Sequence, residues 1–514
     1  MFSNISEINT DIMAANIVLI VLFVILTAAI SLVSVFLIGK YHALKNEETE
    51  SVGSIKPIHV FFIILAVGIV VRLILTFTIK GYGPNYETAY DIAGRVVDGD
   101  GFTGFTSYRS LSPIIGYLYA LFVGWGRSMG LVQADIAMQL FMKLPFLLAD
   151  IALAGVIYAL AVKYCNRYVA IAVSVLYFLN PLTFVMSSVW GSEMIILALA
   201  LVVTFWFVLS KNMFGMCVAA SVSCLVSSYA VFVVPVVGFY AVYSIVKSVI
   251  NIVKAKPSFD SVMRDSAYSN VFYAPLCIII GFALMYLLSL PAYYADGSVG
   301  LAEVYNRLFV MPFTSDSSAI SHYTTNGLSI YTVITNNFAS LGPQFNLVLF
   351  AVIFSAMTAV FTIVFYLMKH NRANLVLIAS FMAFTAAVYM MGSNEWSLVP
   401  ALVLTLPAYI ATKDRRILKV FAATSLFVVI NALLSLYCGG MISGDLITDA
   451  DANNMAVAGG AVGVFSILLS VFTVLVHIYY AVAVLDITVA KRRKEFITDR
   501  TASFGECMGN WVRS

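Results

Sequence analysis

The sequence predicts an all-α membrane protein whose chain crosses the bilayer many times. Hydrophobic residues make up 61% of its 514 residues and charged residues only 11%, and the mean hydropathy is +0.95. A soluble globular protein carries about 25% charged residues, so this chain could not cover a water-facing surface of its size. The apolar stretches are long and continuous, which excludes a porin-like barrel. The net charge of +3 is too small to indicate nucleic acid as a partner.

Thirteen apolar runs predict membrane helices, because a span of the ~30 Å hydrocarbon core needs about 20 apolar residues. The six cysteines are scattered without a Cys-x-x-Cys pair, so neither a zinc site nor a disulfide framework is indicated. The runs lie at residues 16–38, 58–78, 142–164, 167–188, 191–210, 213–228, 229–247, 270–290, 345–368, 373–391, 397–412, 417–437 and 460–488.

The uneven distribution of Lys and Arg predicts the orientation. With the N-terminus outside and one crossing per run, 22 of the 29 Lys and Arg residues fall on the inner side. We therefore expect the N-terminus outside and the basic C-terminal tail, with its KRRKEF stretch at 491–496, in the cytoplasm, where it only anchors topology and meets anionic lipids. Residues 111–126 are apolar but short, and we expect them to be re-entrant or to lie at the outer interface. The alternative is that they cross and that the chain returns near 139–145.

This topology places three segments on the outer side, at 79–110, 291–344 and 438–459. It divides the chain into an N-terminal extra helix with a cytoplasmic loop (1–57), a transmembrane core with the outer loops 79–110 and 291–344 (58–440), and the last membrane helix with the basic tail (441–514). Large outer loops on a many-helix core favour chemistry or binding at the outer face.

The first outer loop carries a candidate acid pair. Apolar residues recur at helical spacing from Asn85 to Val97, which predicts a short amphipathic helix at the membrane surface. Glu87 and Asp91 are four residues apart and share one face of that helix. Such a pair can take a proton from a hydroxyl or hold a metal ion. A solvated polar face is the more frequent explanation of this spacing.

Further ionisable residues lie within or beside the apolar runs. Glu193 begins one predicted helix at its outer end, and Glu395 lies in a short outer hairpin. For each of them the sequence leaves open a functional and a structural role. Lys143 and Asp150 are seven residues apart, so we expect an ion pair between them, with contact to an anionic headgroup as the alternative for Lys143. Arg72 is expected to reach the interface with its long side chain.

Five short motifs follow one another over residues 58–440 in an order that resembles a known superfamily. They are Gly99 to Phe102 after the acidic helix, SPIIGYL at 112–118, Lys143-Leu144-Pro145 with Ala149-Asp150, Phe178-Leu179-Asn180-Pro181 leading to Trp190-Gly191, and NEWSLVPAL at 394–402. In sequence and order they resemble motifs of the GT-C membrane glycosyltransferases. More narrowly, they are similar to the bacterial relatives of the eukaryotic GPI-anchor mannosyltransferase family.

The chain departs from the family pattern at several positions. Where the family has Trp-Gly-Gln-x-Asp, this chain has Ser192 in place of Gln and Met194 in place of Asp, with Glu193 one position earlier. Of the family's His-Glu-Arg motif only Glu395 is kept, between Asn394 and Trp396. The family's Lys-Pro-Gln stretch is Ser-Ser-Tyr at 227–229. A metal or phosphate contact of the family is therefore absent or rebuilt in this chain.

The resemblance implies a GT-C-like bundle with about 13 transmembrane helices and extracytoplasmic loops with short interfacial helices. It implies transfer of a sugar, mannosyltransferase-like, from a polyprenyl-phosphate-linked donor to a glycan, lipid or protein acceptor in a bacterial cell envelope. Its partners would also include membrane lipids, and its only cofactor would be a divalent cation, Mg²⁺ or Mn²⁺, for which no ligands are assigned. The alternative is a catalytically inactive relative that binds a lipid-linked glycan or serves in an envelope-assembly complex.

The family mechanism assigns roles to seven residues of this chain. A carboxylate takes the proton of the acceptor hydroxyl, and a cation stabilises the leaving lipid phosphate. The base would be Glu87 or Asp91, and the sequence leaves this choice open. Glu193 would be a second acid, and either Arg109 or Lys143 would contact the phosphate. Glu395 and Trp396 would take part in substrate binding.

Overall fold

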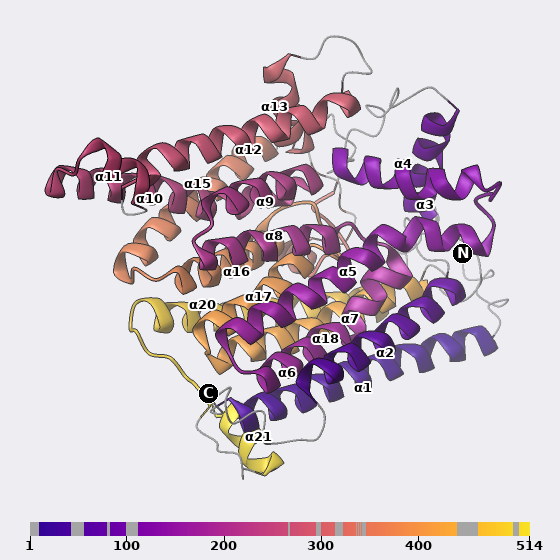
Figure 1. Cartoon of the computed structure of the whole chain (residues 1–514). Coiled ribbons are helices and arrows are strands. Elements are labelled where there is room, and N and C mark those ends of the chain that lie inside the picture. Colours follow the sequence, from indigo (N-terminus) through magenta and orange to yellow (C-terminus); the bar gives the residue numbers. More distant parts are fainter. Residues whose placement is uncertain are drawn as a thin grey trace.

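The computed structural model describes most of the chain as a bundle of long helices (Figure 1). The described residues are 10–42, 56–79, 83–98, 112–265, 268–293, 300–313, 322–335, 337, 339, 341, 346–438, 461–496 and 503–513. The predicted outer segment 438–459 therefore lies outside the described residues except for its first position.

Nine helices of this described part are long and apolar enough to cross a membrane. The chain is therefore an all-α, multi-pass membrane protein. The nine helices are α1 (Thr10–Tyr41), α2 (Pro57–Thr78), α5 (Ile136–Tyr164), α10 (Val234–Ala255), α12 (Asn270–Tyr293), α15 (Leu347–Met368), α16 (Arg372–Tyr389), α18 (Arg415–Cys438) and α20 (Ala461–Thr488).

One further pair passes the length and hydropathy test together: α6 (Arg167–Phe178) and the continuous α7 (Pro181–Phe184) and η4 (Val185–Trp190), which are bent by 49° at a break. If this pair is one span rather than a re-entrant loop, the described residues hold ten spans. Three other predicted runs fold into shorter apolar helices, α8 (Met194–Ser210), α9 (Met213–Val226) and α17 (Val399–Thr412). At 1.5 Å per residue these three are about 21–26 Å long, shorter than the hydrocarbon core. All thirteen predicted runs are thus helical, but only nine or ten of them are long enough to cross.

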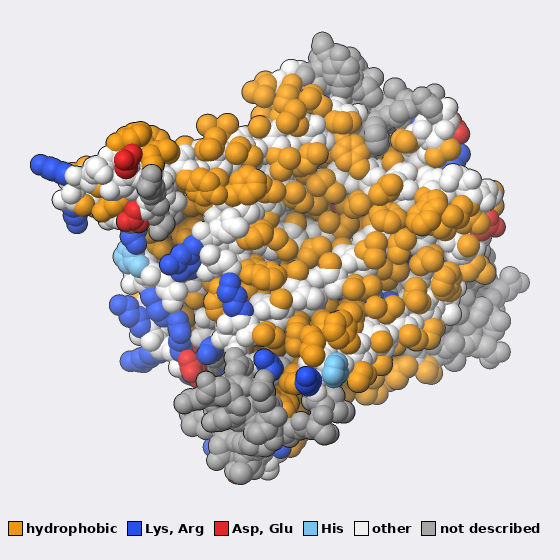
Figure 2. All heavy atoms as spheres, viewed as in Figure 1, with side chains coloured by type: hydrophobic (Ala, Val, Ile, Leu, Met, Phe, Trp, Pro, Cys, Tyr) orange, Lys and Arg blue, Asp and Glu red, His pale blue; other side chains and the backbone are white. Residues whose placement is uncertain are grey.

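Helix α17, one of the two 14-residue helices, is enclosed within the bundle. Only Ala411 of α17 is not fully buried, and the helix packs against α5, α8, α16 and α18. Helices at the periphery expose large apolar side chains, which form the continuous apolar surface in Figure 2. A surface of this kind is stable in lipid and not in water. Examples from α1, α2, α10, α12, α15 and α20 are Val21, Ile74, Val246, Ile279, Val352 and Leu475, each at least 49% exposed.

Positive charge gathers at one end of the bundle, which we call the basic end (Figure 2). Helices α1, α5, α8, α10 and α17 finish there, and α11 (Phe259–Arg264) and α21 (Phe504–Val512) lie nearby (Figure 1). This arrangement agrees with the charge asymmetry from which the orientation was predicted. The lysines that end these helices are Lys40, Lys163, Lys211, Lys254, Lys256 and Lys413.

The opposite end carries the short helices α3 (Gly83–Val97) and α4 (Pro113–Ser128) (Figure 1). Helix α3 confirms the predicted amphipathic helix of the first outer loop. The Tyr117 hydroxyl at the start of α4 donates a hydrogen bond to the Leu288 carbonyl of α12 (2.6 Å), and Arg127 in its last turn donates to the Tyr90 carbonyl of α3 (3.2 Å). Both ends of α4 therefore contact elements at the opposite end, as expected for a segment that does not cross.

The predicted loop 291–344 contains short elements at the same end. Helix α13 (Leu301–Phe309) and η7 (Met311–Phe313) precede strand β1 (Thr324–Thr325) and helix α14 (Ile330–Ile334). Strand β1 pairs in parallel with β2 (Ser393–Asn394), with Thr324 opposite Ser393. This small sheet fixes the loop to the hairpin between α16 and α17. A further short helix, η5 (Ser228–Phe232), joins α9 to α10.

Two expectations about charged residues are wrong. Arg72 does not reach the interface, because its guanidinium is 1% exposed and pairs with Asp150 (Nε–Oδ2 2.7 Å). The same aspartate accepts hydrogen bonds from the hydroxyls of Tyr177 (2.6 Å) and Ser187 (2.8 Å). The expected pair of Asp150 with Lys143 is replaced by this network, since α2 and the bend before η4 bring better placed donors to the carboxylate.

The basic tail does more than anchor topology. The Lys494 N–H donates to Asp414 and the Lys494 carbonyl accepts from the Arg415 N–H, so the stretch at 491–496 is fixed to the start of α18. Helix α21 packs against α1, where Phe36 and Phe504 are in contact (5.3 Å between ring centroids).

Candidate functional site

The break between η4 and α8 presents an acidic residue at the opposite end of the bundle. Gly191 has φ +71, a left-handed conformation that glycine adopts without strain. The N–H groups of Gly191 and Ser192 both donate to the Met186 carbonyl at 3.0 Å, which closes the turn. Glu193 then takes the N-cap position of α8. The positive end of the helix dipole favours a carboxylate at this position.

Glu193 has an environment that changes its proton affinity. Its side chain is partly exposed, and desolvation by the surrounding protein raises its pKa from 4.5 to about 7. No side chain of the described part of the chain forms a hydrogen bond or ion pair with the carboxylate. Its charge acts on the hydroxyls of Tyr119 in α4 and Tyr229 in η5. The carboxylate therefore remains available to exchange a proton near neutral pH.

The hairpin between α16 and α17 carries a second carboxylate at this end of the bundle, that of Glu395. The Asn326 amide donates a hydrogen bond to Glu395 (Nδ2–Oε1 3.3 Å). Desolvation raises the Glu395 pKa to about 7, against the lowering effect of hydrogen bonds from its own backbone and from Asn326. Asn326 itself has φ +55, which asparagine tolerates better than most residues. The β1–β2 pairing thus holds an amide donor against Glu395.

A tyrosine links the two carboxylate-bearing turns. The Tyr229 hydroxyl donates to the Gly392 carbonyl (3.0 Å) and accepts from the Ser397 hydroxyl (3.3 Å) on either side of Glu395. The same tyrosine lies within electrostatic range of Glu193. Both carboxylates therefore belong to one polar region around Tyr229.

Two tryptophans complete this region. The rings of Trp190 and Trp396 meet edge to face, with 5.1 Å between centroids and 73° between planes. Trp396 is 3% exposed, and its indole N–H has no acceptor among the described residues. We call Glu193, Glu395, Trp190, Trp396 and Tyr229 the carboxylate cluster.

Three of the predicted site residues, Glu193, Glu395 and Trp396, are thus brought together. Asp91 lies on α3, where it pairs with Arg95 (3.2 Å) in a half-exposed i,i+4 ion pair. Lys143 is fully buried in α5, and its ammonium donates to the Ile79 carbonyl (2.6 Å) at the end of α2. The side chain of Glu87 and the whole of Arg109 lie outside the described residues.

Other residues of this region carried little or no sequence signal. In the sequence, Tyr229 stands out only as part of the Ser-Ser-Tyr stretch that differs from the family pattern. Nothing in the sequence distinguishes Tyr119 from other residues of its apolar segment, or Asn326 from other residues of its polar loop. In the described ranges, no group of three or more His, Cys, Asp or Glu side chains is close enough to hold a metal ion.

The chain was compared with family models, curated proteins and solved structures, and none of them matched.

Proposed function

We propose that the protein is a membrane glycosyltransferase, mannosyltransferase-like, that transfers a sugar from a polyprenyl-phosphate donor to an acceptor at the extracytoplasmic face of a bacterial membrane. Its bundle would be GT-C-like, with about 13 membrane helices. The carboxylate cluster is the observation that carries this proposal. It combines two carboxylates whose pKa is about 7 with two tryptophans at the end of a membrane bundle.

In this proposal Glu193 is the general base. A catalytic carboxylate works best when its pKa lies near the operating pH, and the Glu193 pKa of about 7 meets that condition. Glu193 takes the proton of the acceptor hydroxyl as that oxygen bonds to the anomeric carbon of the donor sugar. The bond from this carbon to the phosphate oxygen breaks, and the lipid phosphate leaves with the bonding electron pair.

The other members of the carboxylate cluster would hold the sugar. Aromatic side chains with a few well-placed polar groups are typical of small-molecule sites. The indole N–H of Trp396 is a donor for a sugar hydroxyl, and Glu395 is an acceptor. A site at the end of the bundle suits a donor whose tail stays in the bilayer while its sugar meets an acceptor in water.

Asp91 suits the role of base less well than Glu193. Its carboxylate is 45% exposed and forms an i,i+4 ion pair with Arg95 at the surface, and such exposed pairs contribute little. Glu87 remains a candidate from the family resemblance. The same resemblance supplies Arg109 as the phosphate contact and a divalent cation, Mg²⁺ or Mn²⁺, as cofactor.

A transfer assay tests this proposal. The full-length protein in lipid vesicles is given radiolabelled polyprenyl-phosphate sugars and a panel of glycan, lipid and peptide acceptors. Glu193→Gln is expected to lower turnover by about 10²- to 10⁴-fold, as removal of a general base does. The matched control Asp91→Asn should stay within about threefold of the wild type.

The other outcomes of this assay distinguish between the candidate bases and between an enzyme and an inactive protein. Equal turnover in the wild type and Glu193→Gln would reject Glu193 as the base, and a loss in Glu87→Gln alone would move that role to α3. Binding of a lipid-linked sugar without turnover of any donor would instead favour a catalytically inactive glycan-binding protein.

A further inference from the structure

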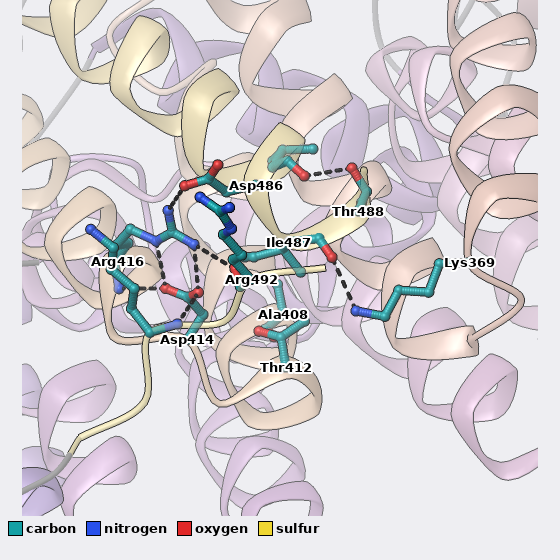
Figure 3. A network of polar contacts seen from close by, with 11 residues as sticks. Lys369, Ala408, Thr412, Asp414, Arg416, Asp486, Ile487, Thr488 and Arg492 are labelled. Carbon is teal, nitrogen blue, oxygen red and sulfur yellow. Dashed lines mark hydrogen bonds and ion pairs between the residues drawn. The ribbon is translucent and has the colours of Figure 1, made fainter. Parts of the chain in front are cut away.

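The turn between α17 and α18 at the basic end is organised by Asp414. Its Oδ1 accepts hydrogen bonds from the backbone N–H and the Nε of Arg416, both at 3.0 Å. Its Oδ2 accepts from the Arg416 Nη2 and from the Lys494 N–H, both at 2.9 Å. Figure 3 shows how these contacts enclose the carboxylate. Asp414 has no oxygen left for another cation.

Arg416 also forms an ion pair with Asp486, the second acidic residue of this region. Its Nη1 contacts Asp486 of α20 at 2.6 Å, and its Nη2 donates to the Arg492 carbonyl at 3.1 Å (Figure 3). One guanidinium therefore satisfies both aspartates and joins α18 to α20 and to the C-terminal segment.

Arg415, the adjacent residue, interacts with the Asp414 charge but is poor in hydrogen bonds. It is 7% exposed, and its Nε and Nη1 have no hydrogen-bond partner among the described residues. A buried guanidinium that lacks hydrogen bonds is costly, because such a charge needs both a counter-charge and acceptors. No acceptor in the described part of the chain offsets this cost.

Lys419 lies one helical turn further along α18, on the same face as Arg415. Both cations face Tyr479 of α20, since the Lys419 ammonium is 5.7 Å from the centre of the Tyr479 ring and Arg415 interacts electrostatically with the same tyrosine. Lys419 is also repelled by Arg415, Arg416 and Lys494. Its one hydrogen bond goes to the Val512 carbonyl of α21 (3.0 Å). Two cations therefore lie together between α18 and α20, with α21 in contact with Lys419.

The positive charge extends to the neighbouring helix end. The Lys369 ammonium at the end of α15 donates to the Ile487 carbonyl at 3.0 Å (Figure 3). Burial, together with the nearby charges of Arg493 and Lys491, lowers its pKa. An anion bound in this region is therefore attracted by cations from several elements.

We propose that Arg415 and Lys419 bind the phosphate group of an anionic phospholipid between α18, α20 and α21. Arginine binds phosphate oxygens with two parallel N–H bonds, and the unpartnered Nε and Nη1 of Arg415 are suited to this geometry. Basic sites between membrane helices on the cytoplasmic side are known places for anionic headgroups.

A lipid is the favoured source of this phosphate because of where the site lies. The two cations occupy the first turns of a membrane helix, at the level where headgroups are found. Helix α21, whose Val512 carbonyl accepts the hydrogen bond of Lys419, exposes Phe504 (50%) and Val512 (67%), as a helix lying at the interface does. The acyl chains would continue along the apolar surface of the bundle.

Lipid-dependent stability tests the proposal. The delipidated full-length protein in neutral detergent is titrated with phosphatidic acid, phosphatidylglycerol, phosphatidylcholine or inorganic phosphate. A thermal-shift assay follows unfolding, and native mass spectrometry detects the lipid adducts. The wild type should bind and be stabilised by the two anionic lipids and not by phosphatidylcholine. Arg415→Gln and Lys419→Gln should each weaken this binding about tenfold or more.

The matched control is Lys254→Gln, which removes one exposed charge from α10 at the same end. It should bind anionic lipid like the wild type. Unchanged lipid affinity in both Arg415→Gln and Lys419→Gln would overturn the proposal, as would equal stabilisation by phosphatidylcholine. Stabilisation by inorganic phosphate alone would reject the proposal that the bound phosphate belongs to a lipid. If Arg415→Gln does not fold, Lys419→Gln and Arg415→Lys, which keeps the charge but not the paired N–H geometry, decide the question.

Discussion

At the scale of single residues, Glu193 and Glu395 make the stability of the protein depend on pH. Each carboxyl has a pKa of about 7 in the folded chain and 4.5 as the ordinary value. Between these values the unfolded chain loses the proton and the folded chain keeps it. The contribution of these two groups to the free energy of unfolding is therefore greatest below pH 4.5. It falls as the pH rises to about 7.

Glu193→Gln removes one of these titrations, so we expect it to raise the thermal stability at pH 8 relative to the wild type. The gain is at most ~3 kcal/mol, because each pKa unit corresponds to about 1.4 kcal/mol. The two proteins should be closer in stability at pH 5.5. Melting temperatures in one detergent at both pH values check this. A variant less stable than the wild type at pH 8 would mean that Glu193 supports the fold, contrary to its role as a base.

Arg72 illustrates the opposite case, a buried charge that the fold requires. Its guanidinium pairs with Asp150 and donates to the Thr183 hydroxyl (2.9 Å), and it lies 3.7 Å from the centre of the Phe178 ring. Arg72→Met leaves Asp150 without its counter-charge, so we expect a loss of about 3–5 kcal/mol. The measurement is the unfolding midpoint in detergent. A loss below about 1 kcal/mol would show that the tyrosine and serine donors suffice for Asp150.

At the scale of elements, helix α4 should leave both of its ends on one side of the membrane. We expect Ser112→Cys and Met129→Cys, in a background without the native cysteines, to react with an impermeant maleimide added to the outside of intact cells. Met129 is 57% exposed and follows the helix, while Ser112 precedes it. Lys211→Cys at the basic end is the control and should react only after the cells are opened. Reaction of only one α4 end from outside would show that α4 crosses.

The sequence predicted most elements but few partners. Apolar runs located the helices because hydropathy acts over about 20 neighbouring residues. Helix length was less predictable, since α17 is enclosed by protein and need not match the bilayer. The partner of Arg72 is 78 residues away and that of Glu395 is 69 residues away. Contacts at such separations depend on the three-dimensional packing, and a single sequence gives no local pattern for them.

At the scale of the whole molecule, lysines end three helices at the basic end in an unusual conformation. Lys211, Lys256 and Lys413 have φ of +62, +45 and +59, a region that costs most residues about 1–2 kcal/mol. Glycine or asparagine is the usual residue there. A cation, however, interacts favourably with the negative end of the helix dipole and with anionic headgroups. The placement of charge at this end thus outweighs the local backbone preference.

This charge placement predicts that the basic end faces the cytoplasm. A fluorescent protein that matures only in the cytoplasm, fused after residue 514, should fluoresce, because the C-terminal segment is fixed to the basic end by Asp414. An alkaline phosphatase fused at the same point, which requires an oxidising compartment, should be inactive. The reverse pair of results would invert the orientation. It would also place the carboxylate cluster on the cytoplasmic side, where an acceptor in the outer envelope could not reach it.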